Sequence, residues 1–498
     1  MPRVLIIGSG FAGMSAACFM AKAGWDVTIV ETLETPGGRA RQICEEGFSF
    51  DMGPSWYWMP EVFSNFFAAF NKKVSDYYHL QRLNPSYRVY TAGKAEDIPA
   101  DFDSLQRFFE SYEKGAGEQL SLFLQEAEDK YKIGMQRLVF QPGLSISEFA
   151  DWKTFQGLIR LNIFNSIESH IRKYFRHPFL LRLLEFPILF LGALPSNTPA
   201  LYSLLNYADM VLGTWYPTGG IYSVVAAMHQ LASELGVKFH FSEKVTSIVV
   251  EGKSAKKIIT DKNEYFADVV IGGADYHYIE TSLLSSSFRS YSDKYWDSRT
   301  MAPSCLMYYV GLNKRLQNIQ HHNLFLDTSF EDHALDIYVN KIWPANPSFY
   351  VSVASVTDST VAPAGGENLV FLVPVAADLK DNAIIHDQYF ELIKNRFEKL
   401  TGNSISSNIV FKKSFGVNDF KETYNAFKGN AYGLANTLWQ TAVFKPRCKS
   451  KKVKNLFYTG QLTVPGPGVP PSLISGQIVA EQVVKEFGSY LHATKNNN

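Results

Sequence analysis

The hydrophobic pattern at the start of the chain predicts a strand, a helix and a second strand. Residues 4–7 form an unbroken apolar run of the kind found in buried parallel strands. A helical pattern follows over residues 14–23, Gly24 ends it, and residues 26–30 form the next apolar run. This order predicts a β-α-β unit, which opens a parallel sheet with helices packed on its faces.

Three glycines in G-x-G-x-x-G spacing occupy the turn between the first strand and the helix. Gly8 permits the tight turn, Gly10 lets a pyrophosphate approach the backbone, and Gly13 lets the helix pack closely on the strand. Glu31 ends the second strand, where a carboxylate accepts hydrogen bonds from a ribose diol. The pattern predicts a dinucleotide site and argues against a 2′-phosphate, but it leaves NAD and FAD open. A structural glycine-rich turn is the alternative.

Further along, residues 286–440 alternate apolar runs at 304–312, 349–356 and 369–375 with a helical pattern at 388–400. These elements predict a second, mixed sheet. Residues 155–195 combine apolar positions at helical spacing with interleaved arginines and lysines, and Pro178 and Pro187 divide them into short helices. Such helices lie either in a membrane interface or in an ordinary buried pair with one solvated face.

Near the C-terminus, an apolar run at 456–459 predicts a last strand that Gly460 ends. A loop rich in proline and glycine follows at 465–471, and we expect Ser472 to cap a helix over 473–486. The positive end of that helix would point at whatever the loop surrounds. A hinge before a packing helix is the alternative interpretation.

The amino-acid composition limits the kinds of partner and site expected for this chain. Lys plus Arg equal Asp plus Glu at 48 each, so no nucleic-acid partner is expected. The chain is 46% hydrophobic and 14% aromatic, which calls for a large apolar pocket or surface. Its four scattered cysteines indicate neither disulfides nor a zinc site and favour a reducing compartment. The adjacent His321 and His322 would point to opposite faces of a strand, so we expect no metal site there.

No signal-peptide pattern opens the chain, and no apolar run reaches the roughly 18 residues that a spanning helix needs. We therefore expect membrane contact, if present, to be peripheral.

Several motifs then occur in a recognisable order. They are G-S-G-F-A-G from Gly8, E-x-x-x-x-P-G-G-R-A from Glu31, F-D-M-G-P ending at Pro54, W-Y-P-T-G-G at 215–220 and P-G-P-G-V-P at 465–470. Together they resemble the carotenoid desaturase family, the bacterial phytoene desaturases and their relatives, over essentially the full chain. The resemblance implies FAD as cofactor and an α/β fold similar to that of amine oxidases.

The resemblance implies a discontinuous Rossmann-type FAD-binding domain from residues 1–75, 215–285 and 441–498. Residues 76–150 and 286–440 would form a mixed-sheet substrate domain, and 151–214 a helical region at a membrane interface or substrate entrance. Besides Gly8, Gly10, Gly13 and Glu31, the expected cofactor contacts are Gly38, Arg39, Gly53, Pro54, Val245, Gly460, Val469 and Pro470. Arg39 would offer a fixed cation to the pyrophosphate and Val245 backbone groups to the adenine.

The activity implied is successive desaturation of 15-cis-phytoene to neurosporene and lycopene, with a hydride passing to the flavin N5 and a vicinal proton leaving. A later carotenoid 3,4-desaturase or carotenoid oxygenase, an amine or other small-molecule oxidase, and a carotenoid-binding protein without turnover are the alternatives. Arg182 is the one polar residue carried over as catalytic, since His177 and Pro178 stand where the family has an acid. Oxygen or a membrane quinone would accept the electrons, and the protein would be cytoplasmic and peripherally membrane-associated.

Overall fold

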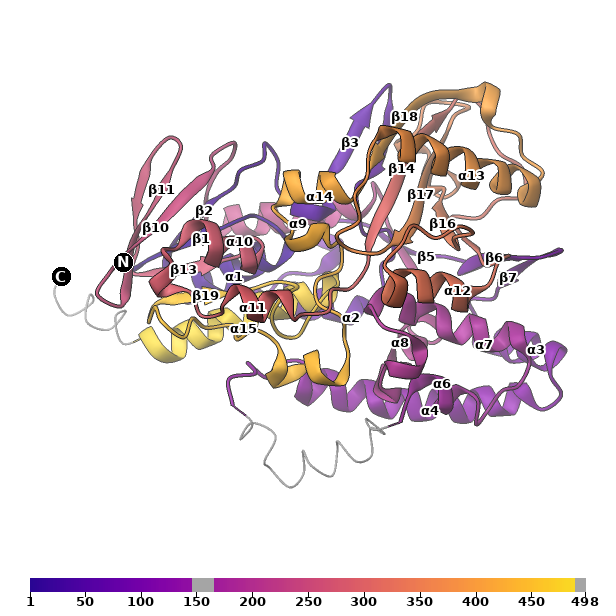
Figure 1. Ribbon diagram of the computed structural model, residues 1–498, viewed down its shortest axis with the longest axis horizontal. Coiled ribbons are helices and arrows are strands. Elements are labelled where there is room, and N and C mark those ends of the chain that lie inside the picture. The colour runs from indigo at the N-terminus through magenta and orange to yellow at the C-terminus, as the bar shows by residue number, and fades with distance from the viewer. Residues whose placement is uncertain (146–164, 489–498) are drawn as a thin grey trace.

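The computed structural model describes residues 1–145 and 165–488 (Figure 1). Two sheets lie side by side. A parallel sheet with its helices occupies the end of the molecule where the chain begins, and a larger mixed sheet occupies the other end, with a group of helices beneath it. The first part of the predicted helical stretch at 155–195 lies outside the described residues.

Five strands in the order β19-β13-β1-β2-β9, all paired in parallel, form the first sheet. They are β1 (Arg3–Ile7), β2 (Asp26–Val30), β9 (Lys238–His240), β13 (Val269–Gly272) and β19 (Leu456–Tyr458). The predicted β-α-β unit is present, with α1 (Phe11–Lys22) between β1 and β2. Strands β9, β13 and β19 join it from much later in the chain, so three distant segments build one sheet.

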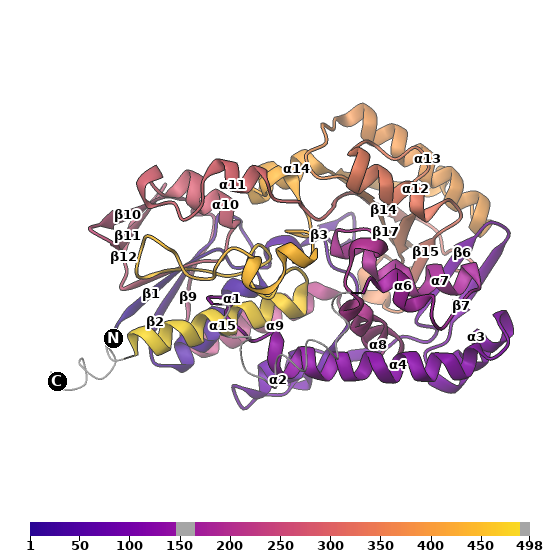
Figure 2. The ribbon, with the colours of Figure 1, turned by 60° about the horizontal axis from the view of Figure 1, so that its bottom comes forward.

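Helices α1, α9 (Ile221–Glu234) and α15 (Val469–Phe487) pack against one face of this sheet. Figure 2 shows α15 running along α1. The contact is close: a Cβ atom added at Gly476 of α15 would lie 2.5 Å from the carbonyl oxygen of Ala12. Ser15 Oγ also donates a 2.7 Å hydrogen bond to the carbonyl of Leu473. The last helix is thereby fastened to the first.

The expectation that Ser472 caps this last helix is wrong. Helix α15 begins at Val469, and Gly468 is its N-cap. Pro470 and Pro471 fit inside the first turn because the N–H groups they lack have no partner there. Ser472 instead donates from Oγ to the carbonyl of Gly468 at 2.7 Å. The helix therefore starts closer to Gly460 than the proline pattern suggested.

A three-stranded antiparallel sheet covers the other face of the parallel sheet. Its strands are β10 (Val245–Glu251), β11 (Ser254–Thr260) and β12 (Glu264–Phe266). Ile248 and Ile258 pack with Leu5, Ile7 and Val270 in one buried cluster. Short helices α10 (Tyr276–Tyr278) and α11 (Asp293–Asp297) follow β13 on this side.

Seven strands in the order β18-β14-β17-β16-β15-β6-β7 form the second sheet. They are β6 (Tyr87–Thr91), β7 (Lys94–Ile98), β14 (Ser304–Leu312), β15 (His322–Phe325), β16 (Phe349–Ser352), β17 (Glu367–Val375) and β18 (Ile409–Phe415). The predicted strands at 304–312 and 369–375 are present. The third ends at Ser352 rather than at 356, because residues 354–356 turn into a short 3-10 helix.

The two faces of the second sheet have different neighbours. Helix α13 (Ala383–Thr401) covers one face, where Phe371 packs against Phe390 and Phe397 at ring distances of 6.1 and 5.4 Å. The opposite face carries Met307, Leu372, Tyr350 and Leu324 side by side on β14, β17, β16 and β15. These side chains belong to a separate buried cluster, on the face that looks toward the long helices.

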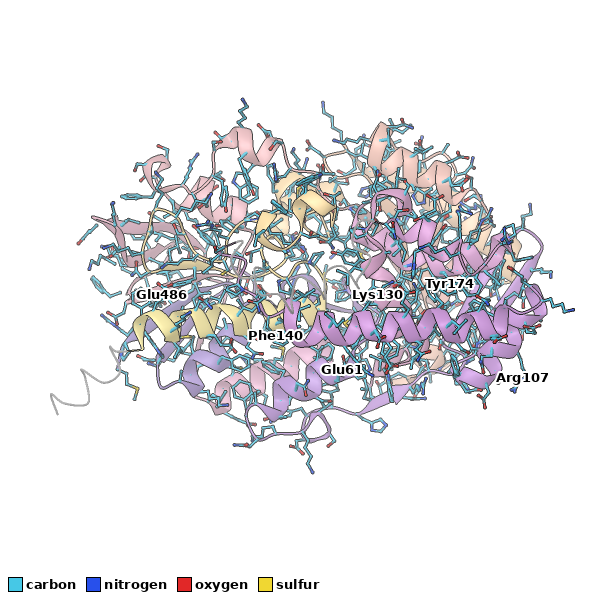
Figure 3. All side chains as sticks on the ribbon, turned by 90° about the horizontal axis from the view of Figure 1, so that it is seen from below. Glu61, Arg107, Lys130, Phe140, Tyr174 and Glu486 are labelled. Carbon is cyan, nitrogen blue, oxygen red and sulfur yellow. The ribbon has the colours of Figure 1, made fainter. Side chains whose placement is uncertain are left out.

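Helices α3 (Phe102–Tyr112), α4 (Ala116–Ile133), α6 (Ile167–Ile171), α7 (Pro178–Glu185) and α8 (Leu204–Met210) lie beneath this sheet. Pro178 opens α7 and Pro187 lies in a short 3-10 helix, so the prolines do separate short helices as expected. Figure 3, seen from below, shows α4 lengthwise, with Lys130 in its last turn. No helix among the described residues is both long and apolar enough to cross a membrane.

The remaining elements connect these layers. Hairpin β3 (Gln42–Glu45) and β4 (Phe48–Asp51) follows the first β-α-β unit, and β5 (Leu80–Arg82) pairs with β8 (Trp215–Pro217) where the chain crosses between the two halves. Helices α2 (Pro60–Ala68), α12 (Phe330–Leu335) and α14 (Val417–Tyr424) lie between the strands in sequence.

Candidate functional site

A cavity runs from the carboxyl ends of the parallel strands to the inner face of the second sheet. It holds about 1500 Å³ of space free of protein atoms, its open mouth included. Gly8 after β1, Glu31 after β2, Gly273 after β13 and Thr459 after β19 all line it. Ligands of open α/β sheets bind at this edge, where the strand ends leave a crevice.

Glu31 lies at one end of the cavity and is held rigidly. Its Oε2 accepts hydrogen bonds from the backbone N–H of Ser9 at 2.7 Å and from Ser9 Oγ at 2.8 Å. Its Oε1 accepts from the N–H of Leu33 at 2.9 Å. A carboxylate has about four acceptor positions, so one remains for a hydroxyl group of a ligand.

The glycine turn leaves backbone space beside α1. Gly8 has a φ of 97°, a left-handed value that favours glycine. A Cβ at Gly13 would lie 2.2 Å from the carbonyl oxygen of Gly8, so this position is needed for helix packing. A Cβ at Gly10 would meet nothing within 4 Å, because it would point into open space at the start of α1. Gly38, with a φ of 56°, faces Gly10 across that space.

Arg39 supplies a buried cation to the middle of the cavity. Burial lowers the pKa of its guanidinium, and the nearby carboxylate of Asp275 opposes that change. The guanidinium lies 5.4 Å from the ring centre of Tyr424, and its Nε is buried without a hydrogen-bond partner. A buried donor left free in this way fits an anionic ligand. The electrostatic effect of Asp275, 236 residues away in the chain, could not be read from the sequence.

Gly53 and Pro54 line the cavity next to Arg39. A Cβ at Gly53 would lie 2.4 Å from the carbonyl oxygen of Arg39, so only glycine lets the two segments approach. Asp51, which precedes this turn, does not line the cavity. Its carboxylate accepts hydrogen bonds from the N–H groups of Ile221 at 2.6 Å and Tyr222 at 3.1 Å, at the start of α9.

The C-terminal segment forms the opposite wall. Gly460 has a φ of 109°, and its N–H donates to Ser475 Oγ at 3.0 Å. Val469 and Ser472, in the first turn of α15, also line the cavity. Only Gly468 and Val469 carry unpaired backbone N–H groups at the start of this helix, because Pro470 and Pro471 have none, and the helix dipole makes this end positive. The wall therefore presents partial positive charge to the cavity.

Beyond Gly53 the lining becomes apolar. The side chains here come from the second sheet, α14 and the loop before the last strand; they are Cys305, Met307, Leu372, Phe420, Ala431 and Tyr432. Sequence reasoning named none of them, because β14, β17 and α14 lie more than 250 residues from the glycine turn. Only alternation along the strands, which places Cys305 and Met307 on one face, could have pointed to part of this set.

A small polar group lies next to this apolar part. Tyr350 is the cross-strand neighbour of Leu372, and its hydroxyl lies 2.6 Å from His322 Nδ1. The His322 ring stacks on Trp56, with ring centres 4.1 Å apart. His322 Nε2 and Trp56 Nε1 are both buried and have no hydrogen-bond partner. Buried polar atoms of this kind are uncommon and indicate a missing partner.

Most of the residues predicted to contact the cofactor line the cavity: Gly8, Gly10, Glu31, Gly38, Arg39, Gly53, Pro54, Gly460 and Val469. Gly13 and Pro470 lie behind the lining, in the first turns of α1 and α15. Val245 begins β10 and is buried against Thr260, and it is not part of the lining. Arg182 lies on α7 and is not part of the lining either.

The adjacent histidines each have a packing partner. His321 Nδ1 lies 2.8 Å from Thr357 Oγ1, and burial lowers the pKa of His321 to about 3. Burial also lowers the pKa of His322. Within residues 1–145 and 165–488, no cluster of three His, Cys, Asp or Glu side chains is arranged to hold a metal ion.

Comparison with known proteins explains this arrangement. Residues 11–484 match the family described as flavin containing amine oxidoreductase. A carotenoid 3,4-desaturase of Haloarcula japonica is 40% identical over 97% of this chain and 98% of its own. The chain belongs to the carotenoid desaturase family of flavin-dependent oxidoreductases.

Two further comparisons agree with this membership. A zeta-carotene-forming phytoene desaturase of Myxococcus xanthus is 29% identical over 97% of this desaturase and 94% of its own chain. The crystal structure of an oxidoreductase from Methanosarcina mazei covers 96% of this desaturase with a TM-score of 0.64 at 16% identity, and all of that chain is matched. This similarity shows that the two proteins share a fold, and it is the amine-oxidase-like fold that the motifs predicted.

The protein binds FAD, and the cavity suits it. Glu31 would hold the ribose, the N-terminal turn of α1 and Arg39 the pyrophosphate, and Gly460 with α15 the pyrimidine edge of the ring. The apolar lining from Met307 to Tyr432 would then enclose the reacting part of a substrate. Bound FAD supplies a two-electron acceptor for a hydride, and the side chains around it exclude water.

Proposed function

We propose that the protein is a carotenoid desaturase that removes two hydrogens across the 3,4 bond of a carotenoid end group. The observation that carries this proposal is the 40% identity, over nearly the full length of both chains, to the carotenoid 3,4-desaturase of Haloarcula japonica. The phytoene desaturase relative is 29% identical over a similar length.

The apolar part of the cavity, called the chamber below, suits a long apolar substrate. Met307, Leu372 and Phe420 line it, and all three are buried, with exposed fractions of 1%, 6% and 4%. A hydride leaves an allylic carbon of the polyene, and the conjugated double bonds spread the resulting positive charge. A proton then leaves the neighbouring carbon, which completes the new double bond. The apolar lining keeps water from adding to the cation.

The polar group beside the chamber favours a substrate whose far end is not a plain hydrocarbon. Trp56 Nε1 can only donate a hydrogen bond, whereas a neutral imidazole nitrogen that carries no proton accepts one. A hydroxyl group that reached these atoms would accept from Trp56 Nε1 or donate to an unprotonated His322 Nε2. An end-group modification of this kind belongs to late steps of carotenoid synthesis, not to phytoene.

Conversion of 15-cis-phytoene through neurosporene to lycopene is the second candidate. The similarity to zeta-carotene-forming and diapophytoene desaturases supports it, because the similarity to those relatives also extends over almost their whole length. An amine oxidase is less well supported, since an amine substrate gains nothing from the apolar lining around Leu372.

Separate incubations decide between these candidates. The FAD-loaded protein is mixed with phytoene, neurosporene, a hydroxylated carotenoid and a polyamine, and the products are separated by chromatography. We expect a longer chromophore only from the carotenoid with the hydroxylated end group. Conversion of phytoene to lycopene would instead establish the second candidate. Anaerobic bleaching of the flavin by a substrate would exclude a binding protein without turnover.

We further propose that the protein works in the cytoplasm as a peripheral membrane protein, because its substrate does not dissolve in water. Trp439, Phe444 and Phe140 support this, being 71%, 46% and 37% exposed. The segments that carry them are neighbours, since a Cβ on Gly143 would lie 3.4 Å from the carbonyl oxygen of Ala442. Figure 3 shows Phe140 on the lower face, beyond the end of α4. Oxygen or a membrane quinone would then accept the electrons.

A further inference from the structure

Lys445 is a buried lysine whose charge no described carboxylate neutralises. Its side chain is 3% exposed. Lys130, the other described lysine buried to this degree, pairs with Glu126 at 3.2 Å. Lys445 Nζ donates to the amide oxygen of Asn436 at 3.1 Å. Among the described residues, no acidic group raises its pKa, and burial lowers that pKa to about 8. The side chain therefore still carries its proton at pH 7.

The ammonium group lies directly behind the wall of the cofactor cavity. A Cβ atom built on Gly466 would lie 3.2 Å from Lys445 Nζ, in the loop between the lining residues Thr463 and Gly468. Thr463 Oγ donates a 2.7 Å hydrogen bond to the carbonyl of Pro446, the residue after Lys445. Lys445 is thus fixed to the same loop that forms the pyrimidine side of the cavity.

A second wall of the cavity meets the first at this lysine. Ala431 and Tyr432 line the apolar part of the cavity, and Asn436, which holds the ammonium group, follows four residues after Tyr432. The positive end of α15 points into the cavity from the same side. Two positive features, one from a side chain behind the wall and one from a helix, therefore lie at one end of the site.

A buried cation without a counter-charge costs several kcal/mol in a medium of low dielectric constant. Proteins retain such a costly buried charge at sites where an opposite charge forms nearby during function. A hydride carries two electrons and one proton, so its arrival adds one negative charge to the ring that receives it. We propose that the ammonium group of Lys445 stabilises this negative charge on the reduced flavin and so sets its reduction potential.

The role is electrostatic, since a loop separates Lys445 from the cavity. It rests on the FAD site and not on the identity of the carotenoid, so a failed substrate assay leaves it standing. The test therefore measures the flavin itself. The reduction potential of the holoprotein is determined anaerobically against a reference dye, for the wild type, Lys445→Met and Lys445→Arg. Lys452→Met removes an exposed lysine nearby and is the matched control.

We expect the equilibrium constant for reduction to fall at least about tenfold in Lys445→Met, which is about 30 mV for a two-electron couple. Lys445→Arg and Lys452→Met should stay near the wild type. Sulfite, which adds to oxidised flavin and leaves a negative charge on the ring, should bind at least about tenfold more weakly to Lys445→Met. Unchanged potential and sulfite affinity in a flavin-loaded Lys445→Met protein would overturn the proposal.

A second variant covers the case in which Lys445→Met does not fold. Asn436→Asp keeps the shape of the side chain and places a carboxylate beside Lys445 Nζ, where the two charges cancel. The potential should fall in this variant too, although the lysine remains in place. A wild-type potential in folded, flavin-loaded Asn436→Asp would contradict the proposal independently of the first variant.

Discussion

Asp51 accepts a 2.6 Å hydrogen bond from the backbone N–H of Ile221, a residue 170 positions later in the chain. The bond fastens the turn before Gly53 to the first turn of α9. The carboxylate also accepts from Tyr222 N–H at 3.1 Å. A Cβ at Gly220 would lie 2.5 Å from this carboxylate, so the glycine of W-Y-P-T-G-G is required by the approach of Asp51. Two of the family motifs are therefore one structural unit.

Asp51→Asn should change the pH dependence of stability. Burial raises the pKa of Asp51 to about 7, although the N–H groups of Ile221 and Tyr222 oppose the rise. In the unfolded chain an Asp carboxyl has a pKa near 3.9. Between about pH 4 and pH 7 the folded protein thus holds a proton that the unfolded chain has lost. The stabilisation from this group is complete at low pH and declines as the pH rises to about 7.

Urea unfolding of the wild type and Asp51→Asn at several pH values tests this. The difference in free energy of unfolding between the two should shrink from pH 4.5 to pH 7 and stay level above pH 8. Because Asn would turn an N–H group toward one of the backbone donors, we also expect a loss of about 1–3 kcal/mol. A difference that stays constant from pH 4.5 to pH 7 would show that Asp51 is ionised in the folded protein throughout this range and would contradict the prediction.

Gly10→Ala and Gly13→Ala should fail in different ways. The Cβ at position 13 meets the Gly8 carbonyl at 2.2 Å, so Gly13→Ala should lose more than about 3 kcal/mol of stability. The Cβ at position 10 meets no protein atom within 4 Å, so Gly10→Ala should fold with nearly normal stability. It would occupy space that the pyrophosphate needs, and FAD affinity should fall at least about tenfold. Thermal unfolding of the apoproteins and titration of flavin fluorescence separate the two effects.

Leu372→Trp should block the apolar chamber without disturbing the cofactor. Leu372 lies on the inner face of the second sheet and lines the cavity, with 6% of its side chain exposed. A larger ring there would occupy the volume of the polyene. We expect at least about a tenfold loss of desaturation with a normal flavin spectrum. Leu372→Met conserves volume and should retain most activity; a similar loss in both variants would point to a folding defect.

The double variant Trp439→Ser, Phe444→Ser should weaken membrane association. The two rings lie 5.6 Å apart and are 71% and 46% exposed. Removal of buried apolar area in the lipid interface lowers binding by roughly 25 cal/mol per Å². Flotation with liposomes should recover less of the variant, while its FAD content stays unchanged. Phe266→Ser, which removes a 56% exposed ring on β12, serves as the control, and equal flotation of all three proteins would place the membrane contact elsewhere.

Arg182→Ala examines the one polar residue that the family resemblance marked as catalytic. We expect lower desaturation with FAD retained, through substrate orientation from α7 and not through contact with the flavin, because Arg182 does not line the cavity. A liposome assay with quantified flavin measures this. Unchanged turnover would remove Arg182 from the site.

The sequence alone determined the nucleotide end of the site. Gly8, Gly10 and Glu31 act through backbone shape and one local carboxylate, and all of them lie within a single β-α-β unit. Such local features follow from residue type and spacing, because the contacts they need are short in sequence. The same holds for strands β14 and β17, whose apolar runs predicted them.

Only the tertiary structure decided the other end. Asp275 beside Arg39, Met307 beside Leu372 and Lys445 behind Gly466 are contacts between segments that the chain brings together only on folding. A residue's periodicity shows which face it occupies but not which distant face it meets. The first turn of α15 illustrates the limit: its prolines signalled a loop, yet a first helical turn also accepts proline, and the packing of the following residues against α1 decided between the two.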